Sequence, residues 1–134
     1  DNSIQSINEN DWILADIKRG LAIIDKKNSE KYIPQMINLD LLEGISFSKG
    51  CYTGQEVVAR VQHRGKIKQR MFYITFESNS NEIDAQSEVM CEDKKVGSLV
   101  ISKKSDNNFH GLAVINATDS DKDLLIDVSE VNVN

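Results

Sequence analysis

Apolar residues between positions 11 and 19 recur at intervals of three and four, the spacing that places side chains on one face of a helix. Asn8 or Asn10 can cap the first turn, because an asparagine side chain accepts hydrogen bonds from the free N–H groups there. Gly20 follows the pattern and is suited to end it, since glycine readily adopts the left-handed conformation common after helices. The sequence therefore predicts a helix over residues 11–19 with one buried face.

Two further apolar stretches follow this helix. Residues 21–25 are predicted to form a short buried strand, because an uninterrupted apolar run precedes an aspartate there. Residues 37–47 are also largely apolar, and we expect them to pack across the helix.

A second helix is predicted downstream from a cap signal. Thr53 and Glu56 form the T-x-x-E pattern of a capping box, in which each side chain bonds to a backbone N–H of the other residue. Good helix formers then continue over residues 56–61, and Gly65 stops or redirects the helix.

From about residue 70 the pattern changes to short aromatic and β-branched runs, which strands prefer, separated by clusters of serine, asparagine and aspartate. The predicted strands cover residues 71–76, 88–91, 96–102, 109–116 and 124–128. Five short strands with polar turns indicate a small antiparallel barrel or sandwich. The fold class is therefore α+β, with short helices in residues 1–66 and an antiparallel β-barrel domain in residues 67–134.

The distribution of charge limits the possible partners. A net charge of −5 argues against a chain that holds nucleic acid through phosphate neutralisation alone, so direct nucleic-acid binding is not expected. Acidic residues concentrate near the end of the chain, whereas basic residues gather between positions 60 and 70. That basic stretch has two interpretations, a solvated strand or loop and a local anion site.

Cysteine usage and the apolar stretches bear on the compartment. Cys51 and Cys91 are far apart, and no signal-peptide pattern precedes them, which fits a reducing cytoplasm. The apolar stretches are too short to span a bilayer, so no membrane association is expected. Isolated histidines and the lack of C-x-x-C predict no metal site. Because the chain opens on Asp1, we expect it to be a fragment of a longer protein.

The segment around Cys51 is the best candidate for chemistry. Glycines at positions 50 and 54 let the backbone bend sharply, and Cys51 precedes a predicted helix start whose dipole favours anions. Lys49 adds positive potential, and such surroundings raise the thiolate fraction of a cysteine. The segment is thus either a reactive thiolate or anion cradle, or a buried cysteine in a tight turn. Cys91 lies within a predicted strand and is interpreted as a core residue.

Aromatic and polar neighbours leave similar alternatives. Trp12 and Tyr52 can each serve as a packing residue or as an aromatic wall against a flat ring. Gln55 and Glu56 can bind the edge of a heteroaromatic ring, although the capping box already explains Glu56 structurally.

The run K-G-C-Y-T-G-Q-E at residues 49–56 resembles the signature of the YgfZ family of folate-binding proteins, relatives of the glycine-cleavage T-protein. The likeness extends to W-x-L-x-x-I-x-x-G from Trp12 to Gly20, and to Ile33-Pro34-Gln35. It is specific over about residues 12–65. Beyond that range it rests on the expected barrel.

The resemblance implies a protein that binds tetrahydrofolate or a derivative and supports iron–sulfur enzymes, including those that modify tRNA. Its implied partners are folate and iron–sulfur assembly proteins or iron–sulfur tRNA-modifying enzymes. Residues carried over as catalytic or functional are Cys51, Lys49 and Tyr52. Residues carried over as cofactor-binding are Trp12, Gly54, Gln55 and Glu56.

Two other functions stay open beside this one. The first is a folate-dependent aminomethyltransferase of the T-protein type, so whether the chain belongs to an enzyme is undecided. Relatives with that activity carry a pterin-binding carboxylate where this chain has Arg19-Gly20-Leu21, which argues against classical aminomethyl transfer. The second is a non-catalytic fragment whose barrel binds a protein partner.

Overall fold

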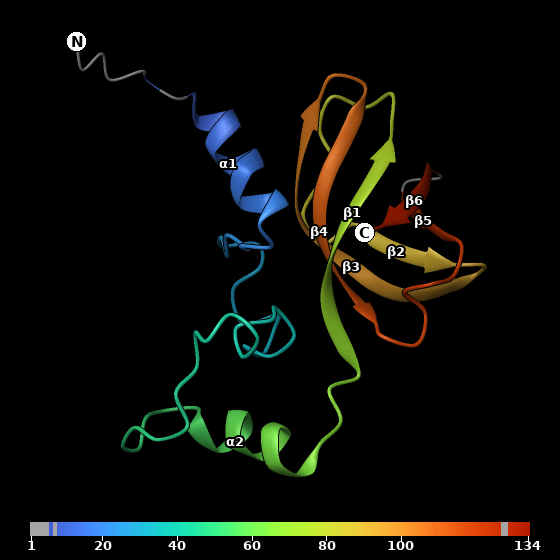
Figure 1. The fold of residues 1–134 in the computed structure, drawn as a ribbon. Coiled ribbons are helices and arrows are strands. Elements are labelled where there is room, and N and C mark those ends of the chain that lie inside the picture. Colours follow the sequence, from blue (N-terminus) through green and yellow to red (C-terminus); the bar gives the residue numbers. More distant parts are fainter. Residues whose placement is uncertain (1–5, 7, 127–128) are drawn as a thin grey trace.

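The computed structural model describes residue 6, residues 8–126 and residues 129–134. Figure 1 shows a β-barrel flanked by a long N-terminal segment with one helix near each end. The helices are α1 (Glu9–Lys18) and α2 (Gln55–Arg64). The strands are β1 (Gln69–Glu77), β2 (Glu88–Cys91), β3 (Lys94–Ser105), β4 (Asn108–Asn116), β5 (Leu124–Ile126) and β6 (Ser129–Val133). Short helices followed by an antiparallel barrel confirm the α+β fold class.

The strands close into a barrel in the order β1-β4-β3-β2-β5-β6, and every neighbouring pair is antiparallel. The β1–β4 pairing is the longest regular one, running from Gln69 opposite Asn116 to Glu77 opposite Asn108. β1 and β6 complete the barrel with a shorter pairing, in which Ile74, Thr75 and Phe76 face residues of β6.

The barrel buries apolar side chains on both faces of its longest strands. Alternate residues such as Ile74, Phe109 and Leu99 belong to the main core cluster, in which the rings of Phe76 and Phe109 stack at 5.2 Å. The intervening residues, including Leu112, belong to a second cluster with Ile17 of α1. β4 is therefore buried almost continuously, which its unbroken apolar run predicts for a strand covered on both sides.

The second cluster attaches the N-terminal segment, residues 8–64, to the barrel. Its other contributors from that segment are Ile13, Ala22, Tyr32, Met36 and Ile37. Polar contacts add to this packing: the buried Asn28 donates its side-chain N–H to the Val100 carbonyl at 2.8 Å. Gln86 of the barrel in turn donates to the Asn28 side-chain oxygen and to the Tyr32 hydroxyl.

The prediction for α1 is confirmed within two residues at its start. Asn8 caps the helix by accepting a hydrogen bond from the Asn10 backbone N–H at 2.8 Å. Gly20, with φ of 74°, follows the last turn as expected. Ile17 is fully buried on the barrel side.

Residues 21–25 do not form the predicted buried strand. Leu21, Ile23 and Ile24 are each more than two-fifths exposed, and no strand includes them. The stretch 37–47 also differs from its prediction. Ile37 packs in the cluster around Ile17, whereas the side chains from Leu41 onward are largely exposed.

All five predicted strands exist, extended by a few residues at β1 and β3. β6 was not predicted, and it is the strand that closes the barrel on β1. Cys91 ends β2 and packs against the main core, as interpreted from its position. Whether residues 1–66 and 67–134 act as separate domains stays a prediction. Among the described residues, no helix has the length and apolar character needed to cross a bilayer.

Candidate functional site

The predicted capping box at the start of α2 is wrong. The N-cap residue is Gly54, not Thr53, and no side chain caps the helix. Gly54 adopts φ of 87°, a left-handed conformation that glycine tolerates at little cost, and this bend starts the helix one residue late. The Glu56 carboxylate instead accepts a hydrogen bond from Arg60 one turn along the exposed face of the helix.

Cys51 is exposed in the turn before α2. The alternative of a buried cysteine packed in a tight turn is therefore excluded. The residues around it are also exposed, including Lys49, and Tyr52 exposes 45% of its surface. The segment presents a thiol, an ammonium group and a phenol on one short surface loop ahead of a helix start.

Lys49 and Tyr52 line an open pocket of about 330 Å³ beside this loop. Most of the other lining side chains are apolar and come from two stretches, the turns at residues 34–46 and the first half of α2. They are Pro34, Leu39, Ile45 and Val58, together with Gly44 and Ser46. The pocket thus combines an apolar lining with an ammonium group and an aromatic ring. That combination suits a flat ring that carries an anionic tail.

A buried amide connects the two walls of this pocket. Gln35 is fully buried, and its side-chain N–H donates to the Val58 carbonyl of α2 at 2.7 Å. The Gln35 side-chain oxygen has no hydrogen-bond partner among the described residues. A buried amide with one unmade bond is costly, so Gln35 fixes the spacing of α2 and the preceding turns at some expense of stability.

A bidentate ion pair fixes the same turns to the barrel. Arg70 of β1 donates two hydrogen bonds to the Asp40 carboxylate, at 2.6 and 2.8 Å, and a third to the Gln35 carbonyl at 2.8 Å. The Arg70 guanidinium holds the pKa of the Asp40 carboxyl below its usual value, and burial of Asp40 opposes this effect. The Asn38 side chain adds a hydrogen bond to the Met71 carbonyl.

These supporting residues were missed by the sequence analysis. Asp40 and Arg70 are thirty residues apart, and no local pattern connects them. Gln35 lies next to the matched Ile33-Pro34 pair, and that position was the only signal available for it.

The structure does not bring all the predicted site residues together. Trp12 lies on α1 with 61% of its surface exposed, and it is not part of the pocket that Lys49 and Tyr52 line. α1 and α2 lie at opposite ends of the N-terminal segment in Figure 1. Gln55 is half-buried in the first turn of α2, and Glu56 points to solvent beside it. Roles for these residues in ligand binding stay predictions.

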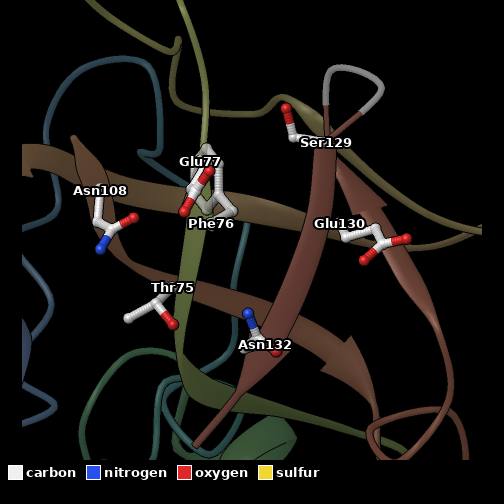
Figure 2. Close-up of a pocket in the computed structure, with 7 residues that line it drawn as sticks. All are labelled: Thr75, Phe76, Glu77, Asn108, Ser129, Glu130 and Asn132. Atoms are coloured by element: carbon white, nitrogen blue, oxygen red, sulfur yellow. The ribbon is translucent and has the colours of Figure 1, made fainter.

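The largest pocket, of about 550 Å³, lies elsewhere, on the barrel where β1, β4 and β6 meet. Figure 2 shows its polar lining, with Glu77 on β1 and Glu130 on β6 set apart from one another. None of the candidate site residues lies in it. Among the described residues there is also no cluster of three or more histidine, cysteine or acidic side chains that could hold a metal ion.

A second polar contact lies under α1. The Tyr73 hydroxyl and His110 Nδ1 are 2.5 Å apart, and the two rings stack with an interplanar angle of 12°. Burial lowers the pKa of His110, and the Lys18 ammonium at the end of α1 lowers it further. Burial also raises the pKa of Tyr73.

Comparison with known proteins agrees with the likeness found in the motif. No family model matches the chain. It is 55% identical over 64 residues to the tRNA-modifying protein YgfZ of Hamiltonella defensa, a match that covers 48% of this chain and 19% of that protein. It is 39% identical over 99 residues to the tRNA-modifying protein YgfZ of Buchnera aphidicola, covering 74% of this chain and 27% of that protein.

A third protein of the same name, from Pectobacterium carotovorum, is 52% identical over 68 residues, covering 51% of this chain and 20% of its own length. The matches therefore span about a fifth to a quarter of these curated relatives. The similarity to YgfZ-type proteins, expected from residues 12–65, is confirmed.

Proposed function

We propose that this chain is part of a YgfZ-type protein that binds a reduced folate and supports tRNA modification by iron–sulfur enzymes. The observation that carries the proposal is the pocket beside the K-G-C-Y-T-G-Q-E segment, where Lys49 and Tyr52 meet an apolar lining. Similarity to three proteins named as tRNA-modifying supports the biological context.

The chemistry of the pocket fits a folate. A pterin is a flat heteroaromatic ring, and the half-exposed Tyr52 ring offers a surface against which such a ring can stack. The glutamate tail of a folate is anionic, and the exposed Lys49 ammonium can pair with it at the rim. The apolar side chains of Pro34, Leu39 and Val58 can exclude water from the ring.

Cys51 is proposed to act beside the bound ligand rather than to hold it. It is exposed and does not line the pocket, although it lies between two residues of the loop that do or nearly do. An accessible thiol close to Lys49 is open to reagents and to partner proteins. Gly54, Gln55 and Glu56 then act by forming the bend and the first turn that present the loop.

The role of Trp12 separates two versions of the site. In this chain Trp12 and the pocket are on different parts of the N-terminal segment. A folate contact by Trp12 therefore requires either a ligand long enough to reach both or a second binding surface completed by other residues of the full-length protein.

Folate titration of the full-length protein by quenching of intrinsic fluorescence tests the proposal. We expect Lys49→Ala and Tyr52→Ala each to weaken binding about tenfold, and Cys51→Ala to leave it unchanged. Lys26→Ala, an exposed lysine outside the pocket, is the matched control. Thiolation of tRNA in cells that carry Cys51→Ala should fall.

The possible results separate the versions. If wild-type full-length protein binds no folate, the proposal fails. If Trp12→Ala abolishes binding while Tyr52→Ala does not, the folate lies on α1 and not in the pocket beside the motif. Normal tRNA thiolation with Cys51→Ala would remove the proposed role of the thiol while leaving folate binding intact.

A further inference from the structure

A separate pocket of about 340 Å³ lies on the opposite side of α2 from nothing the proposed function uses, at the point where α2 leads into β1. Its apolar walls come from three places: the turn that carries Ile33 and Met36, the second half of α2 at Val61, and the connecting stretch at Ile67. Ile67 is only half-buried, so part of this apolar wall faces the open pocket. The walls are aliphatic and thioether groups, which can pack against the face of a flat ring.

Two lysines form the rim of this pocket. Lys66 and Lys68 both line it and both are exposed. Neither takes part in an ion pair within the described part of the chain, where the paired cations are Lys27, Arg60, Arg70, Lys95 and Lys122. The rim therefore carries two positive charges with no internal anion to neutralise them.

A pair of amides forms the remaining part of the lining. The Gln69 side-chain N–H donates to the Asn116 side-chain oxygen at 3.2 Å, and the Asn116 side-chain N–H donates to the Asp119 carboxylate at 3.2 Å. These bonds fix the orientation of both amides. The Gln69 side-chain oxygen accepts no hydrogen bond from the described residues, so an acceptor is available at the pocket.

We propose that this pocket binds one unpaired nucleotide of an RNA strand. The base packs between the aliphatic walls, its exocyclic amine donates to the Gln69 side-chain oxygen, and the flanking phosphates pair with Lys66 and Lys68. Single-stranded RNA is the ligand because a base must leave its stack to enter such a pocket, whereas a duplex offers only its backbone and groove edges. The choice of RNA over other anions rests on the proposed function in tRNA modification.

The acidic character of the whole chain does not oppose this site. A net charge of −5 argues against a general electrostatic grip, but the energy of a local contact depends on charges within about 10 Å at moderate salt. The acidic residues concentrate late in the chain, and the lysines at the rim belong to its basic stretch. Asp119, the acid bonded to this amide pair, is itself paired with Lys122.

Fluorescence anisotropy with a labelled single-stranded oligoribonucleotide and the full-length protein tests the inference. We expect the double variant K66A/K68A to weaken binding about tenfold or more and to reduce the salt dependence by about two units of slope, one for each lost phosphate contact. R19A/K26A removes the same charge from exposed positions of the N-terminal segment and should bind like the wild type. Folate binding should be unchanged in both double variants.

A second variant tests the base contact without changing charge. Ile67→Ala should weaken binding of the oligoribonucleotide several-fold and leave the salt slope unchanged, because it removes apolar contact and no phosphate partner. Its folding is checked by circular dichroism. The same strand annealed into a duplex should compete more weakly than the single strand.

Three results would overturn the inference. The first is equal loss of RNA affinity in K66A/K68A and R19A/K26A, which indicates non-specific attraction. The second is equal affinity for duplex and single strand, and the third is no RNA binding by a full-length protein that still binds folate. That last result leaves the folate proposal intact, whereas loss of folate binding with RNA binding retained would remove the folate proposal alone.

Discussion

The barrel and the N-terminal segment bury apolar surface to different extents. The barrel residues in the main core cluster are at most 9% exposed, and the outer face of β4 is covered by α1. The large hydrophobic side chains found exposed in the described residues all lie in the N-terminal segment. They are Trp12, Leu21, Ile23, Ile24, Leu41, Leu42, Phe47, Tyr52 and Val57.

This difference shows how each part is held. The barrel is stabilised by a continuous apolar core, which is cooperative and tolerant of the loss of one polar contact. The N-terminal segment is attached by the second cluster and by a few polar contacts, chiefly those of Asn28, Gln35 and Arg70. The candidate pockets lie on the part that is attached in this second way.

Matched substitutions in the two parts should differ most. Leu99→Ala removes a fully buried side chain of the barrel core and should lower the free energy of unfolding by about 2–5 kcal/mol. Leu41→Ala removes a side chain that is 67% exposed and should change it by less than about 0.5 kcal/mol. Urea denaturation measures both. Equal losses would mean that the N-terminal segment has a core of its own.

Breaking the ion pair at β1 should release part of the N-terminal segment. Arg70→Met removes three hydrogen bonds and leaves the Asp40 carboxylate 8% exposed without its partner. A loss of about 2–4 kcal/mol follows for a partly buried pair. Hydrogen exchange should speed up over residues 33–43 before it does so in β4. Uniform acceleration across the barrel would contradict the view of a local attachment.

The same pair predicts a dependence on acid. The unfolded carboxyl titrates near 3.8, and Arg70 lowers the pKa of Asp40 in the folded protein. The stabilisation is therefore complete above pH 3.8 and is lost as pH falls toward the lower folded value. The difference in stability between wild type and Arg70→Met should shrink in that window. A constant difference down to pH 2 would argue against an ionic contribution.

The cap of α1 should have a smaller and local effect. Asn8→Ala removes the side-chain bond to the Asn10 backbone and should weaken the helix by about 1 kcal/mol. Asn10→Ala keeps that backbone donor and serves as the control. Hydrogen exchange in the first turn of α1 measures the effect. Similar protection in the two variants would show that packing of Ile17 alone holds the helix.

The smallest expected effect is a pH dependence of the contact between α1 and the barrel. Because burial and Lys18 lower the pKa of His110, the folded state favours the neutral ring. Its contribution is present above pH 6.5 and is lost as pH falls below that value toward the folded pKa. The urea midpoint should fall between pH 7.5 and 5, less so in His110→Phe. His63→Phe, at an exposed position on α2, should leave the dependence unchanged.

Elements set by local signals were predictable from the sequence. α1 has a cap at Asn8 and a stop at Gly20, and both act over a few residues. β4 could be found because an apolar run bounded by turn residues suits a strand covered on both faces.

Elements that depend on distant partners were not predictable. Residues 21–25 have the composition of a strand, but no neighbouring strand pairs with them, and pairing is what stabilises a strand. β6 has alternating polar residues and becomes a strand because β1 and β5 flank it. The capping box failed because Gly54 adopts a left-handed conformation and displaces the helix start.

The candidate site shows the same limit. The K-G-C-Y-T-G-Q-E segment drew attention to Lys49, Cys51 and Tyr52 through its residues alone. The pocket beside it also needs the wall that Gln35 positions and the turn that Asp40 fixes through Arg70. Those contacts join residues more than twenty positions apart, so only the folded chain brings them to one place.

Closure of the barrel by β1 and β6 has a consequence for self-association. A strand at the edge of an open sheet exposes unpaired N–H and C=O groups that can recruit another chain, whereas each strand here has a neighbour on both sides. Aggregation of this chain should therefore begin on the apolar side chains of the N-terminal segment and not by edge-to-edge strand addition. Polar replacements at Leu41 and Leu42 should raise its solubility more than any change on the barrel surface.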